Sequence, residues 1–103
     1  GWEAVAQEAK RIVGQGPGYL TVDVDGLDPA YTPGTGTPES GGITMREAQR
    51  LIRAFSGVDL IGGDVVEVSP PLDPSGMTSL NGATILFEIL CLLSEQVVSS
   101  EAD

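Results

Sequence analysis

Residues 19–42 read YLTVDVDGLDPAYTPGTGTPESGG, and this stretch decides how the chain folds. Its first residues are mostly β-favouring, which predicts a strand over Tyr19–Val24. A side-chain period of two places Asp23 and Asp25 on one face at the end of that strand. Residues 25–42 then hold three prolines, five glycines and three threonines. This composition predicts a long, ordered loop, of the kind that carries function in small domains.

Outside this stretch the chain divides into helices and one further strand. Apolar periodicity and glycine breaks predict a helix over Trp2–Val13, a helix over Ile43–Phe55, a strand region over Val58–Val68 and a helix from about Thr78 to Val97. The alternation of helices and strands predicts an α/β fold with parallel strands and crossover helices. Two strands cannot bury all the apolar surface of this chain, so we expect it to form part of a larger sheet.

Two details of these helices can be predicted as well. Thr44 and Glu47 have the spacing of a capping box at the start of the second helix. The third helix is apolar nearly all round, which predicts packing on several sides. The polar tail Ser99–Asp103 is expected to fray.

Composition limits the possible functions. The chain has 103 residues, enough for one small domain, and a net charge of −10. That charge argues against binding nucleic acid or an anionic membrane, and it suits cationic ligands or metal ions. The most apolar run, Ala83–Leu93, is interrupted by Glu88 and is too short to span a membrane, so we expect a buried helix.

Cysteine and histidine usage narrows the chemistry further. The one cysteine, Cys91, lies in an apolar run and is expected in the core. No disulfide can form within the chain, which favours a reducing, cytoplasmic location. There is no histidine, so a metal bound by this chain must be held by oxygen ligands.

Carboxylates gather where a parallel sheet binds its ligands. Asp25 and Asp28 follow the first strand and Glu67 lies near the end of the second, so all three map to the carboxyl ends of the strands. Asp23 and Asp25 repel each other, and a hard cation such as Mn²⁺ or Mg²⁺ relieves the repulsion. The alternatives are a solvated pair of aspartates and, for Asp28 before Pro29, a turn-forming role.

Two other motifs compete for the same residues. Asp23-Val24-Asp25-Gly26 after an apolar strand resembles the nucleophile motif of haloacid-dehalogenase phosphatases, but Leu27 stands where that family has threonine. A calcium-binding EF-hand loop counted from Asp23 requires glycine at its sixth position and glutamate at its twelfth. Those positions hold Asp28 and Gly34, so the calcium interpretation fails.

A longer pattern resembles a known family. The segments TVDVDGLDP (21–29), TPGTGTP (32–38), GGITMRE (41–47) and DVVEVSP (64–70) are similar to the ureohydrolase family of arginases and agmatinases. The similarity extends over nearly the whole chain. It implies that residues 1–103 are the C-terminal portion of a ureohydrolase catalytic domain with a three-layer α-β-α fold. This portion would supply two strands and three helices of that fold.

The resemblance also implies an activity. Members of this family are binuclear manganese enzymes that hydrolyse a guanidino compound to urea and an amine; nickel serves in some relatives. Asp23 and Asp25 match metal ligands, while Thr37 and Glu67 match residues that contact the substrate. The pattern is closest to agmatinases and guanidinobutyrases, and it implies a small cationic guanidino substrate and a homo-oligomer, a trimer or hexamer.

The family's histidine-bearing metal motifs are absent from this chain. The resemblance therefore assigns no catalytic residue to the chain, and we expect it to be inactive when separated from the rest of such an enzyme. A non-catalytic structural or assembly module of the same fold remains the second interpretation.

Overall fold

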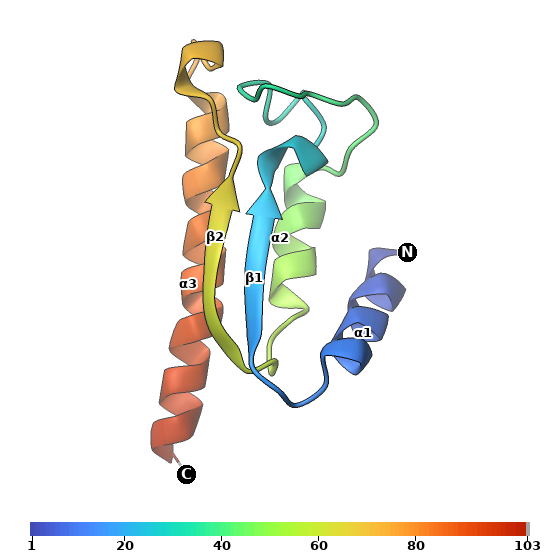
Figure 1. Cartoon of the computed structure of the whole chain (residues 1–103), viewed down its shortest axis with the longest axis vertical. Helices are drawn as coiled ribbons and strands as arrows, with labels where there is room; N and C mark the ends of the chain where they lie inside the picture. Colours follow the sequence, from blue (N-terminus) through green and yellow to red (C-terminus); the bar gives the residue numbers. More distant parts are fainter. Residues whose placement is uncertain (103) are drawn as a thin grey trace.

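A computed structural model describes the backbone of residues 1–102 and the side chains through Ser99. The chain alternates helices and strands (Figure 1): α1 Trp2–Val13, β1 Gly18–Asp23, α2 Met45–Arg53, β2 Leu60–Val66 and α3 Met77–Ala102. Short 3₁₀ turns, Val24–Gly26 and Pro70–Leu72, follow the two strands. β1 and β2 pair in parallel, with Thr21 opposite Asp64. The predicted α/β class and parallel order are confirmed.

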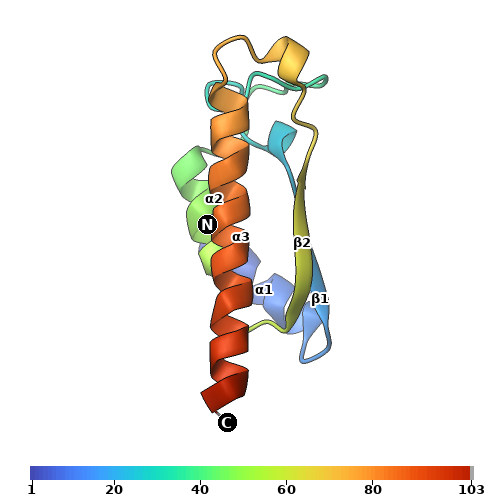
Figure 2. The ribbon, with the colours of Figure 1, turned by 90° about the vertical axis from the view of Figure 1, so that its left-hand side faces the viewer.

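α2 and α3 lie on one face of the two-stranded sheet (Figure 2). Leu20 and Val22 point from β1 toward these helices and pack against the core. The buried core combines residues from both helices, from the start of β2 and from the segments beside the strands: Leu27, Ala48, Ile52, Val58, Leu60, Ile85, Ile89 and Leu92. Because alternate side chains of a strand face opposite ways, Tyr19 and Thr21 lie on the other, exposed face.

Close packing of α3 on the sheet depends on Gly63 in β2. A Cβ atom at Gly63 would lie 2.6 Å from Cγ2 of Ile89 and 2.8 Å from the carbonyl oxygen of Leu20. Both distances are too short for a side chain, so only glycine lets α3 approach the strands at this point.

α2 is fixed at its start and along its side. The predicted capping box is present: Thr44 Oγ1 accepts from the Glu47 amide and Glu47 Oε1 accepts from the Thr44 amide, each at 3.0 Å. On its side, Arg53 donates two hydrogen bonds to Glu88 of α3, at 2.9 and 2.6 Å. Glu88 is 7% exposed. The bonds from Arg53 outweigh burial and hold the pKa of Glu88 below its ordinary value.

The third helix differs from its prediction in three ways. α3 continues to Ala102, so Ser99–Ala102 is helical and not a frayed tail; Asp103 lies outside the described residues. Cys91 is exposed and not in the core. One face of α3 packs on the sheet and α2, while its other face is exposed and carries the apolar residues Leu86, Phe87, Leu90, Val97 and Val98.

The length of α3 also corrects the prediction that its apolar run is too short for a membrane. Over Met77–Ser99 the helix has the length and mean hydropathy, 1.5, of a membrane-crossing segment. The core helix of a soluble protein meets the same criteria, and here Ile85, Ile89 and Leu92 pack against the rest of the chain.

Candidate metal and substrate site

The strand β1 ends at Asp23, and the chain turns sharply there. Val24–Gly26 form a 3₁₀ turn, and Oδ1 of Asp23 accepts a hydrogen bond from the Asp25 amide at 3.0 Å. The prediction that Asp23 and Asp25 share a strand face is therefore wrong. Asp25 belongs to the turn, because the Asp23 side chain caps the turn and ends the extended backbone. The turn still brings the two carboxyl groups together.

Negative charges near the end of β1 alter the pKa of Asp23. Partial desolvation raises the pKa of Asp23, and a hydrogen bond to the Asp25 carboxyl group and the charges of Asp25 and Glu67 raise it further. Only the backbone hydrogen bond from the Asp25 amide acts in the opposite direction. The charges of Asp25 and of Glu67, which follows β2, thus act on Asp23 at the end of β1. A cation placed among them would relieve their mutual repulsion.

Asp28 organises the loop that follows. Its carboxylate accepts from the amides of Ala30 and Gly41, both at 2.9 Å, and these bonds hold the pKa of Asp28 below its ordinary value. Its own amide donates to the Ile43 carbonyl oxygen at 2.9 Å. These contacts agree with the alternative prediction for Asp28, a turn-forming role. The carboxylate closes the loop by joining its two ends.

The two predicted substrate residues reach this end from different segments. Thr37, on the loop, donates a hydrogen bond from its hydroxyl to Oδ2 of Asp25. Glu67, directly after β2, is exposed and has a positive φ of 73°. Residues other than glycine rarely adopt that backbone conformation, and such residues cluster at functional sites. The structure therefore joins Thr37 to Asp25 directly and places Glu67 within electrostatic reach of Asp23.

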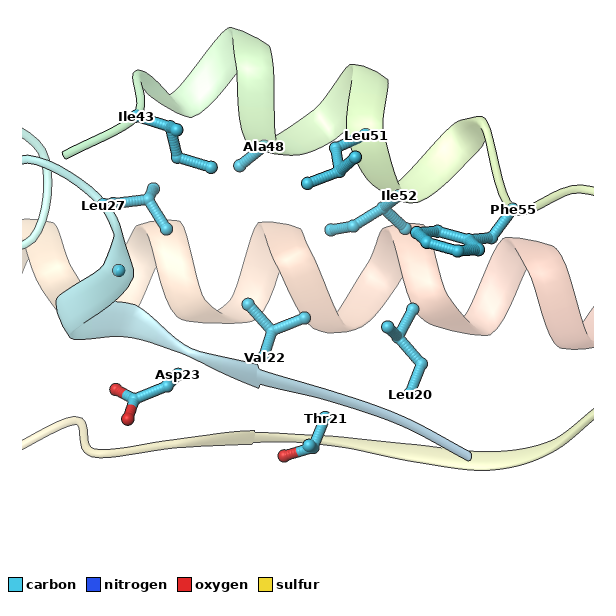
Figure 3. A pocket seen from close by; sticks show the side chains of 11 residues that line it. Leu20, Thr21, Val22, Asp23, Leu27, Ile43, Ala48, Leu51, Ile52 and Phe55 are labelled. Carbon is cyan, nitrogen blue, oxygen red and sulfur yellow. The ribbon is translucent and has the colours of Figure 1, made fainter. Parts of the chain in front are cut away.

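A separate apolar cavity of about 210 Å³ lies between β1 and α2 (Figure 3). Leu20, Val22 and Ile52 point into it, whereas Thr21 and Asp23 point to the opposite side of the strand. The cavity therefore offers an apolar lining, and the carboxylates that could hold a cation lie outside it.

The donor set can be compared with the needs of a metal ion. Carboxylate oxygens of Asp23 and Asp25 suit hard divalent cations such as Mn²⁺. Within the described part of the chain, no group of three or more His, Cys, Asp or Glu side chains converges to hold a metal. These two aspartates fit one side of a metal centre, and the remaining ligands would have to come from another segment.

Sequence reasoning missed the residues that hold the loop against α3. Asp73 is buried and accepts from the amides of Thr78 and Ser79 at 3.0 and 2.9 Å. Thr78 in turn accepts a hydrogen bond from the Gly34 amide at 2.7 Å. An aspartate before Pro74, shortly ahead of a helix start, is a capping signal that could have identified Asp73.

Known proteins resemble this chain in sequence. Guanidinopropionase from Pseudomonas aeruginosa is 59% identical over 100 residues, which are 97% of this chain and 31% of that protein. Guanidinobutyrase from the same organism is 56% identical over 91 residues, covering 88% of this chain and 28% of that protein. The chain thus spans about a third of the length of these relatives.

Solved structures resemble it in fold. A hypothetical agmatinase from Burkholderia thailandensis superposes with a TM-score of 0.90 and 43% identity, over 97% of this chain and 32% of that one. Proclavaminate amidino hydrolase from Streptomyces clavuligerus gives a TM-score of 0.88 and 41% identity, over 92% and 32%. The family model described as "Arginase family" matches residues 1–92. From its strand order, its acidic strand ends and this match over most of its length, the chain belongs to the arginase family.

Proposed function

We propose that this chain is the C-terminal portion of the catalytic domain of a metal-dependent guanidino hydrolase, which releases urea and an amine. The substrate class is a small compound with a cationic guanidinium group, such as agmatine or guanidinobutyrate. The names of the relatives, guanidinopropionase and guanidinobutyrase, support that class. The net charge of −10 also favours a cationic ligand.

One observation carries the proposal: Asp23 ends β1, Asp25 lies in the turn that follows it and Glu67 directly follows β2, so all three lie at the carboxyl ends of two paired parallel strands. That edge is where open parallel sheets bind their ligands. Desolvation and the charges of Asp25 and Glu67 raise the pKa of Asp23, and a bound cation would offset the repulsion. Membership of the arginase family also sets aside the phosphatase alternative.

In this proposal Asp23 and Asp25 are metal ligands. Their carboxylate oxygens would hold part of a pair of manganese ions, with nickel as the alternative metal. Bound divalent cations lower the pKa of water and so make hydroxide available at neutral pH. The Thr37 hydroxyl donates to Oδ2 of Asp25, which leaves Oδ1 as the oxygen without this donor.

Glu67 and Thr37 are the proposed substrate residues. A guanidinium group is planar and binds a carboxylate through two parallel hydrogen bonds. The exposed carboxylate of Glu67 is available for such a pair, and its left-handed backbone turns the side chain at the strand end. Thr37 stands on the loop beside Asp25, within the same acidic end.

A chimera tests this function. The matching third of the Pseudomonas guanidinopropionase is replaced by this chain, and urea release is measured with Mn²⁺ or Ni²⁺. We expect metal-dependent urea release, lost in Asp23→Asn and retained in Asp64→Asn. A folded chimera that binds metal but releases no urea from any guanidino substrate contradicts the proposal. It would favour the second candidate, a structural module, which the lack of a complete metal cluster among the described residues supports.

Assembly and location belong to the same proposal. We expect a trimer or hexamer, measured by sedimentation of the chimera, and a small-molecule substrate with neither nucleic acid nor membrane as partner. The exposed free thiol of Cys91 suits the reducing conditions of the cytoplasm.

A further inference from the structure

Gly34 lies buried in the loop that carries Thr37 and is enclosed by the start of α3. A Cβ atom on Gly34 would lie 2.4 Å from Cβ of Asp73 and 2.9 Å from Oγ1 of Thr78. No side chain fits between those atoms, so the loop backbone packs directly against α3.

Both polar backbone groups of Gly34 are used. Its amide donates to the hydroxyl oxygen of Thr78 at 2.7 Å, across 44 residues of sequence. Its carbonyl oxygen accepts from the Ser69 amide at 2.8 Å. Gly34 therefore joins three segments: the loop, the stretch after β2 and the start of α3.

The position of Thr78 is itself fixed by Asp73, which lies just before α3. It is fully buried, and its amide donates to Asp73, whose carboxylate also accepts from the amide and hydroxyl of Ser79 at 2.9 Å. Burial acts to raise the pKa of Asp73, but the hydrogen bonds from Ser79 and Thr78 prevail and lower it. Asp73 is thus a charged cap that orients the first turn of α3 and, with it, the Thr78 hydroxyl.

The position of this cluster in the chain gives it a role in the site. Gly34 precedes Thr37 by three residues, and Ser69 follows Glu67 by two. The loop is fastened again where Thr37 bonds Asp25. The hydrogen bond between Gly34 and Ser69 is therefore a short link between the two segments that carry the proposed substrate residues.

We infer that Thr78 is a positioning residue: through Gly34 and Ser69, its hydroxyl sets the placement of Thr37 relative to Glu67. The role in substrate selection rests on the proposed function, in which both residues contact the guanidino compound. The placement itself does not, because it needs neither metal nor substrate.

The test compares three variants of the 103-residue chain by NMR and amide hydrogen exchange. Thr78→Val removes the hydroxyl at nearly constant volume, and Thr78→Ser keeps it. Thr84→Val is the matched control, because the Thr84 hydroxyl bonds only the Leu80 carbonyl oxygen within the same helix. In Thr78→Val we expect amide exchange at Gly34 and Ser69 to accelerate roughly tenfold, as for loss of one hydrogen bond.

The resonances of Thr37 and Glu67 should shift in Thr78→Val, return in Thr78→Ser and stay in place in Thr84→Val. A structural role limited to α3 would leave Thr37 and Glu67 unmoved, and that result overturns the inference. If Thr78→Val does not fold, amide hydrogen exchange in the unchanged chain tests the inference instead. Gly34 and Ser69 must then exchange at least tenfold more slowly than the exposed Gly36 amide, and equal rates overturn the inference.

These outcomes are separable from the proposed function. An inactive chimera with the expected exchange pattern refutes the guanidino hydrolase and leaves the positioning role standing. An active chimera, together with Thr37 and Glu67 resonances that do not shift in Thr78→Val, supports the guanidino hydrolase and refutes the positioning role.

Discussion

The hydroxyl of Thr37 donates a hydrogen bond to Oδ2 of Asp25, which ties the long loop to the turn at the end of β1. The two residues are 12 apart in sequence. The bond leaves one oxygen of Asp25 without this donor and holds the loop over the acidic end. It therefore links a proposed metal ligand to a proposed substrate residue.

Replacement of Thr37 should impair the site more than the fold. In the chimera with guanidinopropionase, we expect Thr37→Val to lower kcat/KM roughly tenfold, the effect of one lost hydrogen bond to a charged group. Thr21→Val is the matched control, because Thr21 also donates to an aspartate, Asp64, on the exposed sheet face. Equal activity losses in the two variants would show that Thr37 has no special role.

Removal of one proposed metal ligand should weaken metal binding. The isolated chain is expected to bind Mn²⁺ weakly, because two carboxylates form only part of a metal centre. Asp23→Asn should reduce the affinity at least roughly tenfold, because it removes a charged ligand. The measurement is paramagnetic broadening of nearby amide resonances during Mn²⁺ titration. Asp64→Asn is the control, and a loss of similar size there would place the metal elsewhere.

The ion pair between Arg53 of α2 and Glu88 of α3 should make the stability of the fold depend on pH. The folded pKa of Glu88 lies below its ordinary value of 4.5. The stabilisation from its charge is therefore complete above pH 4.5 and is lost as the pH falls through the folded pKa. At pH 7, Glu88→Gln should lower Tm by roughly 5 °C, and the difference from the unchanged chain should shrink toward pH 3.

Thermal unfolding between pH 3 and 7 measures this effect. Glu95→Gln, which alters an exposed acid bonded to Ser56, is the control. A Glu88→Gln difference that stays constant down to pH 3 would contradict the prediction.

Replacement by valine should change the free energy of unfolding in opposite directions at two buried threonines of the loop. Thr32 is 1% exposed and donates to the Val24 carbonyl oxygen at 2.7 Å. Thr35 is 2% exposed, and its hydroxyl is the buried side-chain oxygen without a hydrogen-bond partner in the described part of the chain. Thr32→Val should lose about 1 kcal/mol of unfolding free energy, whereas Thr35→Val should gain about 1 kcal/mol.

Urea-induced unfolding of the two variants measures that difference, and each serves as control for the other. A clear loss of stability in Thr35→Val would mean that its hydroxyl has a partner in solution.

Gly63 should tolerate no side chain. Gly63→Ala places a methyl group against Ile89 and the Leu20 carbonyl oxygen, and it should cost about 1–3 kcal/mol by forcing α3 away from the sheet. Gly16→Ala is the control, because a Cβ there meets nothing within 4 Å. Chemical denaturation measures both, and a Gly63→Ala variant as stable as Gly16→Ala would contradict the close approach of α3 to β2 at Gly63.

Local patterns predicted the elements well and their ends less well. The helix over Trp2–Val13 and the Thr44–Glu47 capping box are as predicted, because each depends on residues a few positions apart. The strand predicted over Tyr19–Val24 ends one residue earlier, at Asp23, because the Asp23 side chain accepts a hydrogen bond from the Asp25 amide and starts a turn. Period alone cannot detect that competition between side chain and backbone.

The sequence by itself determined the α/β alternation, the acidic ends of the two strands and the resemblance to ureohydrolases. These features follow from spacing along the chain, which the backbone converts directly into faces and edges. The tertiary structure alone decided that Gly34 meets Thr78, 44 residues away, and that Arg53 pairs with Glu88, 35 residues away. It also decided that Cys91 faces outward. Such pairings depend on how helices pack on the sheet, and no local period encodes which side chains that packing brings together.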